Sequence, residues 1–396
     1  MRYSDTIARL GAAGPDGWGL FKRARAMIAD GHDIVEMAIG EPDVPTPDVI
    51  VEATVDALRR GRTVYASGAG EPALRTALAD RYSARTGRPI TPDQVLCFPG
   101  TQTALYTVIR AVAGPGDQVV IGDPMYATYA PVVTACGAEV VPVPLRSDRG
   151  FRLDAADLAE RVTERTTAVL LNTPHNPTGA VLQGEDIDAI GAVAADNDLW
   201  VVSDEVYEEL VFEGTTFCSP LARAATAERT VVLNSISKSH AAPGFRSGWC
   251  VGPAEFCLRA LPLTEAVLFG NQPFIADATA LAVAEPSPVA DGMNRRFAAR
   301  AARLAETLHA RTDLRVSTPE AGMFAIVDVS ASGLGGDAYA EGLLVDGGVA
   351  VMPGSSFGES LADWIRISLT RPDDVFDVGC ERIVAHAGRL AGPAGG

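Results

Sequence analysis

Lysine is almost absent from this chain of 396 residues. Of its 33 basic residues, 31 are arginine, and Lys22 and Lys238 are the two lysines. A lysine amine can attack a carbonyl group, whereas an arginine guanidinium stays protonated and cannot. A lysine that is retained in a chain so strongly biased towards arginine is therefore a candidate for a catalytic role. Lys22 lies in an arginine-rich segment that is predicted to form a basic helix face. Lys238 directly follows an apolar run, where a functional loop is expected.

Basic charge, metal-ligand spacing and long apolar runs are also scarce. The chain carries 50 acidic residues against 33 basic ones, and its net charge of −17 disfavours nucleic acid and anionic membrane surfaces as partners. No stretch of 18 apolar residues runs without a charge or a turn residue, which predicts a cytoplasmic protein without a membrane span. The six cysteines lack CxxC spacing and the five histidines lack an HExxH pattern, so we predict neither a metal site nor a disulfide framework.

From about residue 94 onward, short apolar runs alternate with helical stretches. This order predicts an α/β fold whose large domain, residues 46–285, holds a mostly parallel seven-stranded sheet with helices on both faces. Residues 286–396 are predicted to form a smaller α+β domain, with residues 1–45 packing against it. The predicted strands of the large domain are Gln94–Phe98, Gln118–Ile121, Glu139–Val143, Ala168–Leu171, Leu199–Val202, Thr230–Leu233 and Gly248–Val251. The small domain is predicted to hold helices at Met293–Ala310 and Ala338–Val345, and strands at Phe324–Val329, Val349–Met352 and Trp364–Ser368.

Polar residues follow five of the predicted strands. In open α/β sheets, ligands bind at the carboxyl ends of the strands, so these loops are expected to share one rim. The rim would offer an amine, a carboxylate, aromatic rings, amide and phenol donors, and a glycine at a helix start. These groups suit pyridoxal phosphate, which needs an amine for its aldehyde, an anion at its ring nitrogen and donors for its phosphate. The five loops are Pro99–Gln102, Asp123–Tyr126, Asn172–Gly179, Ser203–Tyr207 and Ser235–Lys238.

Four motifs, in their order and spacing, resemble those of the class I/II aminotransferases of fold type I. They are Asn172–Gly179 (NTPHNPTG), Ser203–Tyr207 (SDEVY), Ser235–Gly248 (SISKSHAAPGFRSG) and Arg366–Ser368. The resemblance covers essentially the whole chain and implies an aspartate-aminotransferase-like large domain. It also implies pyridoxal phosphate as cofactor, and ping-pong transfer of an amino group from an L-amino acid to a 2-oxo acid such as pyruvate or 2-oxoglutarate. One departure is Ala242–Phe245, where the family commonly has Met-Thr-Gly-Trp.

The same resemblance implies roles for the matching residues. Lys238 would hold the cofactor covalently and move the proton of the substrate α-carbon, and Asp204 would keep the ring nitrogen protonated. Asn176 and Tyr207 would bind the phenolate oxygen of the ring, with Tyr207 counted among the catalytic residues. Tyr126 would stack on the ring face.

Two further groups of residues are implied by the resemblance. Arg366 would bind the substrate α-carboxylate through a bidentate fork, with Asn176 and Gly40 on the same substrate side. Tyr65 matches a tyrosine that reaches the phosphate of a neighbouring subunit, which predicts a homodimer with shared sites. The phosphate would be held by Gly100, Thr101, Gln102, Ser235, Ser237 and Arg246.

The substrate is less constrained than the cofactor. Within the family the chain resembles arginine/pyruvate transaminases and bacterial aspartate aminotransferases. Some aspartate enzymes read the second carboxylate of the substrate with a lysine beside the phosphate loop, and here Lys22 is the only other lysine. Arginine or another basic or neutral amino acid is therefore favoured as donor, with aspartate as the alternative.

Other activities stay open at this point. A β-lyase, a decarboxylase or an amino acid oxidase would begin with the same bound cofactor. A remote alternative is a serine hydrolase, because Gly354–Gly358 matches G-x-S-x-G with Ser356 at its centre and His386 as the only histidine after it. A catalytically inactive binding module is a further alternative, disfavoured because Lys238, Asp204 and Arg366 are all present.

Overall fold

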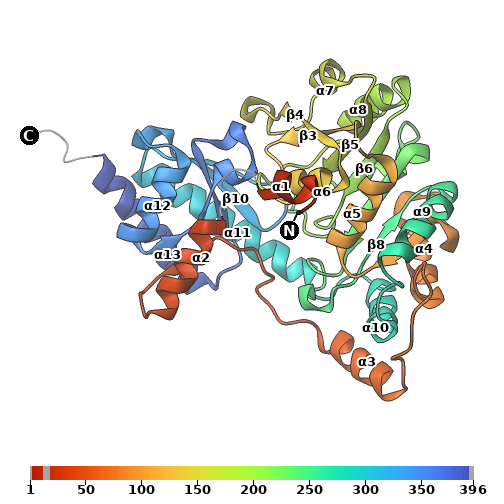
Figure 1. Ribbon diagram of the computed structural model, residues 1–396. Helices are drawn as coiled ribbons and strands as arrows, with labels where there is room; N and C mark the ends of the chain where they lie inside the picture. Colours follow the sequence, from red (N-terminus) through yellow and green to blue (C-terminus); the bar gives the residue numbers. More distant parts are fainter. Residues whose placement is uncertain (1, 12–17, 392–396) are drawn as a thin grey trace, which may run out of the picture.

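The computed structural model describes residues 2–11 and 18–391 and shows two lobes, each built around its own sheet (Figure 1). The sheet of the large lobe has seven strands in the order β2-β8-β7-β6-β5-β3-β4, and β8 alone runs antiparallel to its neighbours. All seven predicted strands are confirmed to within two residues. Their bounds are β2 Val95–Phe98, β3 Gln118–Asp123, β4 Glu139–Pro144, β5 Thr166–Asn172, β6 Trp200–Asp204, β7 Thr230–Ser235 and β8 Gly248–Val251.

Helices cover both faces of this sheet, which explains why its strands are nearly continuous apolar runs. Side chains alternate along each strand, so that Leu96 and Phe98 face one helical layer while Val95 and Cys97 face another. The first layer is formed by α5 Thr101–Val112, α6 Tyr129–Cys136 and α9 Ala254–Val267. The opposite face is covered by α4 Pro72–Thr86, α7 Ala155–Arg161, α8 Gly184–Asp196 and α10 Pro273–Val283.

The small lobe is an antiparallel sheet in the order β12-β13-β10-β9, packed against long helices. The prediction of one strand over Val349–Met352 is wrong, because the two halves of this segment pair with different partners. Val349–Ala350 (β11) pairs in parallel with β1, whereas Met352–Pro353 (β12) pairs antiparallel with β13. The remaining elements of this lobe are α2 Trp18–Ala29, β1 Val35–Glu36, α11 Ala290–Arg311, β9 Arg315–Ser317, β10 Phe324–Asp328, α12 Gly336–Gly347, β13 Trp364–Ser368 and α13 Asp373–Leu390.

The pairing of β1 with β11 joins the N-terminal segment to the small lobe. The proposed domain boundaries near residues 45 and 285 stay a prediction. No helix in residues 2–11 and 18–391 combines the length and the apolar character that crossing a membrane requires. The other helices are α1 Asp5–Gly11 and α3 Asp48–Arg59. Single 3-10 turns lie at Pro92–Gln94, Ser147–Arg149, Pro220–Ala222, Ala227–Arg229, Pro243–Phe245, Ser330–Ser332, Gly354–Phe357 and Glu359–Leu361.

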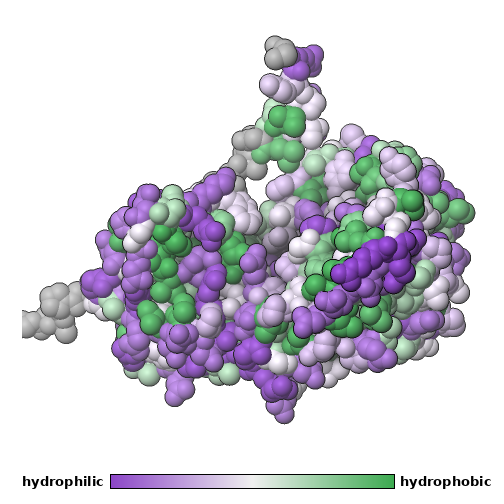
Figure 2. All heavy atoms as spheres, turned by 90° about the horizontal axis from the view of Figure 1, so that it is seen from below, coloured by the Kyte–Doolittle hydropathy of each residue, from purple (hydrophilic) through white to green (hydrophobic). Residues whose placement is uncertain are grey.

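Figure 1 shows that α3 and α10 lie together at one end of the large lobe. Seen from that side, the surface carries apolar patches beside strongly polar ones (Figure 2). Helix α3 contributes exposed apolar side chains, among them Val49, Val51 and Leu58. Val51 and Leu58 are two turns apart and lie on one side of the helix, and exposed apolar side chains of this kind favour an interaction surface.

A buried ion-pair network joins α4 to the segment that follows β6. Arg81 contacts Glu209, and Arg85 contacts Glu208, with the side chains of Arg81 and Glu209 only 7% and 10% exposed. Removing one member of a buried pair leaves the other charge without its counter-charge, which costs several kcal/mol.

We expect Glu209→Ala to lower the free energy of unfolding by about 3 kcal/mol, because Arg81 would stay buried with only the more distant Glu208 beside it. Urea unfolding followed by circular dichroism measures the loss. Glu255→Ala is the matched control: its partner Arg259 lies one turn away on the same helix and both side chains are largely exposed, so we expect a change within about 0.5 kcal/mol. Equal losses in the two variants would contradict this assignment.

Candidate active site

A pocket of about 300 Å³ lies where the carboxyl ends of the large sheet meet the small lobe. Its volume is in the range of small-molecule sites. Residues from both lobes line it, with Phe324 and Arg366 contributed by the small lobe. The pocket brings together twelve of the residues predicted from the sequence: Gly40, Thr101, Gln102, Tyr126, Asn176, Asp204, Tyr207, Ser235, Ser237, Lys238, Arg246 and Arg366.

Two predicted site residues do not line the pocket. Gly100 lies directly behind it, since a Cβ atom at this position would come within 2.2 Å of the Arg246 guanidinium. Tyr65 lies outside the pocket of its own chain, and the residue is 89% exposed. The prediction that Tyr65 serves a second subunit stays a prediction.

Lys238 follows β7 and points its amine into the pocket. Its Nζ atom donates a hydrogen bond to the Gly40 carbonyl at 3.0 Å. Burial lowers the pKa of Lys238 to about 8; Glu41 opposes this shift, and the nearby Arg366 and Arg246 add to it. A substantial fraction of the amine is therefore neutral near physiological pH, as a nucleophile or a general base requires.

Asp204, the last residue of β6, provides a buried carboxylate. Burial raises the pKa of Asp204 to about 6, although the carboxylate accepts hydrogen bonds from the Tyr129 hydroxyl at 2.8 Å and the Val206 amide at 3.3 Å. Such a carboxylate is best stabilised by a cation that enters the pocket, and a protonated pyridine nitrogen is one.

Tyr129 is a functional residue that the sequence interpretation missed. It begins α6, three residues after Tyr126, and the two rings meet edge to face with their centroids 5.5 Å apart. The recurrence of tyrosine three residues after the predicted stacking residue is the signal that could have pointed to it.

The amide of Asn176 is held in place by its neighbours. Its backbone N–H donates to the Asn172 side chain at 2.8 Å, and Asn172 in turn donates to the Asp204 carbonyl at 3.0 Å. Tyr207 is hydrogen-bonded to the Asn176 side chain, and burial raises the pKa of the Tyr207 hydroxyl. The phenol thus stays protonated and can donate to an oxyanion in the pocket.

Arg366 is fixed from several sides. Its guanidinium donates to Asn176 Oδ1 at 3.0 Å and to the Ala38 carbonyl at 2.7 Å, and its central carbon lies 3.8 Å and 4.5 Å from the ring centroids of Phe324 and Phe357. Burial lowers the pKa of Arg366 to about 10, so the group remains a cation at neutral pH. Its Nε atom is buried without a hydrogen-bond partner among the described residues. A planar, preorganised cation of this kind suits a carboxylate ligand.

The N-terminus of α5 forms an anion-binding cradle. Gly100 caps the helix with φ of 87°, and a Cβ atom on Gly248 would come within 2.6 Å of the Thr101 amide nitrogen, so both glycines permit close backbone approach. The Thr101 hydroxyl is buried and has no hydrogen-bond partner within the described part of the chain. Free amides at a helix start, a hydroxyl and the Arg246 guanidinium together suit a phosphate.

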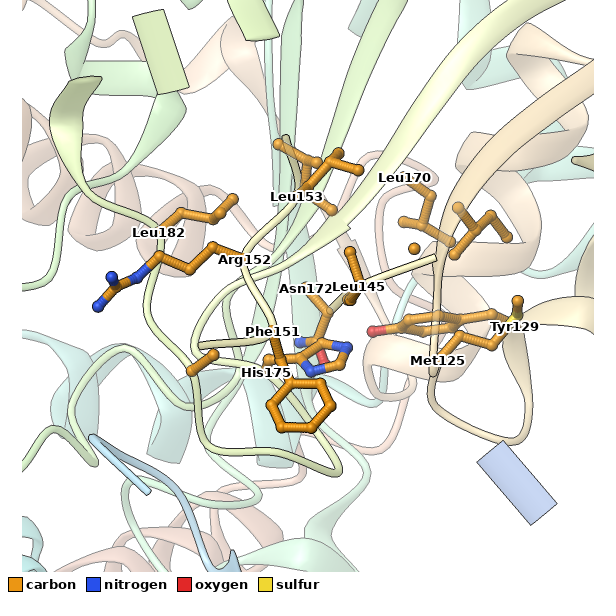
Figure 3. A pocket seen from close by; sticks show the side chains of 14 residues that line it. Met125, Tyr129, Leu145, Phe151, Arg152, Leu153, Leu170, Asn172, His175 and Leu182 are labelled. Atoms are coloured by element: carbon orange, nitrogen blue, oxygen red, sulfur yellow. The ribbon is translucent and has the colours of Figure 1, made fainter. Parts of the chain in front are cut away.

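A smaller cavity, of about 30 Å³, lies behind this site (Figure 3). Apolar side chains line most of it, and the hydroxyl end of Tyr129 points toward Asn172 and His175. His175 shares a 2.7 Å hydrogen bond with the Thr178 hydroxyl, and burial lowers the pKa of His175 to about 4, so its ring is neutral. Arg152 contributes a charged side chain to the lining of this cavity, and its guanidinium is paired with Glu320 at 2.6 Å.

Ser356 and His386 lie apart from the pocket. Ser356 belongs to the 3-10 turn Gly354–Phe357, and its hydroxyl is buried. His386 lies on α13, where its ring packs edge to face on Tyr339 at 5.0 Å between centroids. Neither Ser356 nor His386 is among the residues that line the site, and the segment that carries Ser356 contributes to it through Phe357, whose ring packs on the Arg366 guanidinium.

Known proteins are similar to this chain over most of its length. Residues 32–383 match the family model of class I and II aminotransferases. Over 394 residues, the full length of both proteins, the chain is 41% identical to the arginine–pyruvate transaminase AruH of Pseudomonas aeruginosa. It is 34% identical to the aspartate/prephenate aminotransferase of Thermus thermophilus, over 93% of this chain and 94% of that protein.

Solved structures of aspartate aminotransferases have the same fold as this chain. The aspartate aminotransferase of Thermus thermophilus with maleate matches with a TM-score of 0.91 and 30% identity, covering 98% of this chain and 100% of that chain. The aspartate aminotransferase of Rhizobium meliloti matches with a TM-score of 0.93 and 27% identity, covering 98% and 99%. The predicted aspartate-aminotransferase-like fold is confirmed.

The chain belongs to the class I and II aminotransferases. It is a transaminase that depends on pyridoxal phosphate. The residues present fit this cofactor: they provide an amine of lowered pKa, a buried carboxylate, and a helix start beside a hydroxyl and an arginine. Over residues 2–11 and 18–391, the carboxylate has no cationic partner and the Thr101 hydroxyl has no hydrogen-bond partner.

The raised pKa of Asp204 predicts a pH-dependent stability of the protein freed of its cofactor. The pKa in the folded state, about 6, lies above the ordinary value of 3.8, so folding favours the protonated form. This contribution is fully present below about pH 4 and is lost as the pH rises through 6.

We therefore expect Asp204→Asn to stabilise the cofactor-free protein at pH 7.5 by on the order of 2–3 kcal/mol, and to leave it unchanged at pH 4. Urea unfolding at the two pH values measures this difference. With the cofactor added the order should reverse, since the variant lacks the anion that the ring nitrogen needs. A cofactor-free variant less stable than the wild type at pH 7.5 would contradict the argument.

Proposed function

We propose that this transaminase takes its amino group from L-arginine or another basic or neutral amino acid, and passes it to pyruvate or 2-oxoglutarate. This proposal rests on the charged residues that line the pocket. Its cations are Lys238, Arg246 and Arg366, each of which has a proposed role, and within the described residues no further lysine, arginine or histidine lines the pocket to bind a second carboxylate. Glu41, an exposed carboxylate among the lining residues, favours a cationic donor over an acidic one.

Similarity to the arginine–pyruvate transaminase AruH supports the same donor class. The many aspartate aminotransferases among the relatives keep aspartate as the second candidate. We also propose a cytoplasmic location, which rests on the composition of the chain.

The proposed mechanism assigns each step to a group of this chain. Bound pyridoxal phosphate supplies an aldehyde that reacts with amines and a ring that withdraws electrons from the substrate α-carbon. Arg366 binds the substrate carboxylate and so fixes which bond of the α-carbon can break. Lys238 would hold the cofactor through its amine and, as a neutral amine, would act as the base for the proton of the substrate α-carbon. Asp204 would hold the positive charge of the ring nitrogen.

Asn176 and Tyr207 are proposed to stabilise the phenolate oxygen, and Tyr126 to cover the ring face. Gly100, Thr101 and Gln102 are proposed to bind the phosphate through the start of α5, with Ser235, Ser237 and Arg246 beside them. Gly40 closes the substrate side, where its carbonyl already accepts a hydrogen bond from Lys238.

We further propose a homodimer in which Tyr65 completes the phosphate site of the partner. Exposed apolar side chains on α3 and on the loop after it support this proposal, since apolar surface left exposed on a folded chain favours a partner. They are Val51, Leu58, Val64 and Tyr65. The ring centroid of Tyr65 lies 5.9 Å from that of Phe269, which is exposed as well.

Adding a donor alone, without any 2-oxo acid, tests the reaction class and the donor together. We expect L-arginine to convert the bound cofactor fully to its amine form, with release of one equivalent of 2-oxo acid, and L-aspartate to do so at least tenfold less efficiently. Absorbance of the cofactor and quantification of the products measure this. Release of ammonia, carbon dioxide or hydrogen peroxide would instead indicate a lyase, a decarboxylase or an oxidase.

The two lysines offer a matched pair of variants. Lys238→Ala should abolish turnover, by a factor of at least 10³, because both the covalent attachment and the proton transfer depend on this amine. Lys22→Ala removes an exposed amine on α2 and should retain wild-type activity. Borohydride reduction followed by peptide mapping should place the cofactor on Lys238 alone. Full activity of Lys238→Ala would overturn the assignment.

A further inference from the structure

The loop between α3 and α4 carries Tyr65 away from the pocket of its own chain. Tyr65 and its neighbour Val64 are 89% and 66% exposed, and the ring of Tyr65 meets the similarly exposed Phe269. Because the apolar tip of this loop contacts so little of its own chain, burial in the hydrophobic core of that chain does little to stabilise the loop. It is nevertheless held at several points.

Arg62 provides the first anchor. Its Nε and Nη2 atoms donate to the two carboxylate oxygens of Asp277 on α10, at 2.9 Å each. Nη2 also contacts Glu71, the residue that caps α4. These two carboxylates raise the pKa of the Arg62 guanidinium further above its ordinary value. The guanidinium fork of Arg62 contacts both α10 and the start of α4. Such a bidentate contact fixes the orientation of the loop as well as its distance from the helices, which a single ammonium group cannot do.

The stretch after Tyr65 is anchored as well. The Ser67 amide donates to Glu71 at 3.3 Å, so the carboxylate that Arg62 contacts also holds the far side of the loop. A Cβ atom on Gly270, where φ is 69°, would come within 2.3 Å of the Ser67 carbonyl, so this backbone packs directly on the chain beside Phe269. The tyrosine is thus presented between two fixed points.

We propose that Arg62 is a positioning residue for the active site of the partner subunit. Through Asp277 and Glu71 it holds the loop so that Tyr65 meets the phosphate of the cofactor bound to the other copy of the chain. The inference rests on the proposed homodimer. An anchor is needed because the tyrosine hydroxyl must stay within about 0.5 Å of its productive position to hydrogen-bond the phosphate, whereas the tip of an exposed loop without anchors moves more than that.

The proposal is first tested on the whole enzyme with Arg62→Met, which keeps the length of the side chain and removes both contacts. We expect the dissociation constant of pyridoxal phosphate to rise about tenfold. Arg60→Met is the matched control, because Arg60 lies 3.7 Å from the same Asp277 but is mostly exposed and makes no bidentate contact. It should change the constant by less than twofold. Equal effects of the two variants would overturn the proposal.

Hybrid dimers decide whether Arg62 acts on its own site or on that of the partner. They are assembled from differently tagged subunits, with Lys238→Ala used to silence one site. In a hybrid of Lys238→Ala with Arg62→Met, the one active site is that of the Arg62→Met subunit. The Tyr65 that completes this site comes from the Lys238→Ala subunit, whose Arg62 is intact. We expect half of the wild-type activity and wild-type cofactor affinity at that site.

The reverse hybrid pairs the wild type with a subunit that carries both substitutions. Its one active lysine then receives Tyr65 from a loop that lacks Arg62, and we expect the weakened cofactor affinity of Arg62→Met. The opposite pattern, an impaired first hybrid and an unimpaired second one, would overturn the proposal.

Sedimentation of the wild type separates this inference from the one on which it rests. A monomeric wild-type enzyme would overturn both the homodimer and the role of Arg62. A dimer whose hybrids show no rescue would overturn the role of Arg62 alone. If Arg62→Met does not fold, Arg62→Lys enters the same hybrids, because it keeps the charge and loses the bidentate fork. A smaller effect with the same dependence on the partner would then support the proposal.

Discussion

The carboxylate of Asp204 is the constraint on which the architecture of the site depends. An anion at the end of β6, surrounded by protein, destabilises the fold at neutral pH unless a positive charge joins it, and two hydrogen bonds do not offset its burial. A cofactor with a protonated ring nitrogen removes this destabilisation by placing a positive charge beside the carboxylate. Stability and cofactor binding are therefore linked through one carboxylate. Tyr129 donates a hydrogen bond to that carboxylate, and Asn172 donates one to the backbone carbonyl of the same residue.

A second buried network ties the small lobe to the substrate side of the pocket. Arg300, only 3% exposed, donates to Asp43 at 2.8 Å and to the Leu369 carbonyl at 2.9 Å. Asp43 lies three residues after Gly40, and Leu369 three residues after Arg366. One guanidinium thus sets the distance between the segment that carries Gly40 and the strand that carries Arg366. Arg366 completes the connection across the lobes through its hydrogen bond to Asn176.

The sequence predicts those features that repeat along the chain. Each strand of the large sheet is an apolar run that ends in polar residues, so the sheet and the rim loops follow from local patterns, and Asp204, Asn176 and Lys238 are found together as expected. Tyr129, Phe324 and Glu41 were missed because their place in the pocket depends on how a helix start, a second sheet and the N-terminal segment meet. The split of Val349–Met352 into two strands has the same cause, since only the partner strands distinguish its halves.

The scarcity of lysine acquires a physical meaning in the pocket. Burial lowers the pKa of both Lys238 and Arg366, yet one reaches about 8 and the other stays at about 10. The amine can therefore lose its proton near neutral pH, whereas the guanidinium beside it keeps its charge and its fork for a carboxylate. Arginine serves equally well wherever this chain needs a fixed ion pair, as in Arg62 with Asp277 or Arg300 with Asp43. Lysine is irreplaceable only where the proton must leave, and that requirement singles out position 238.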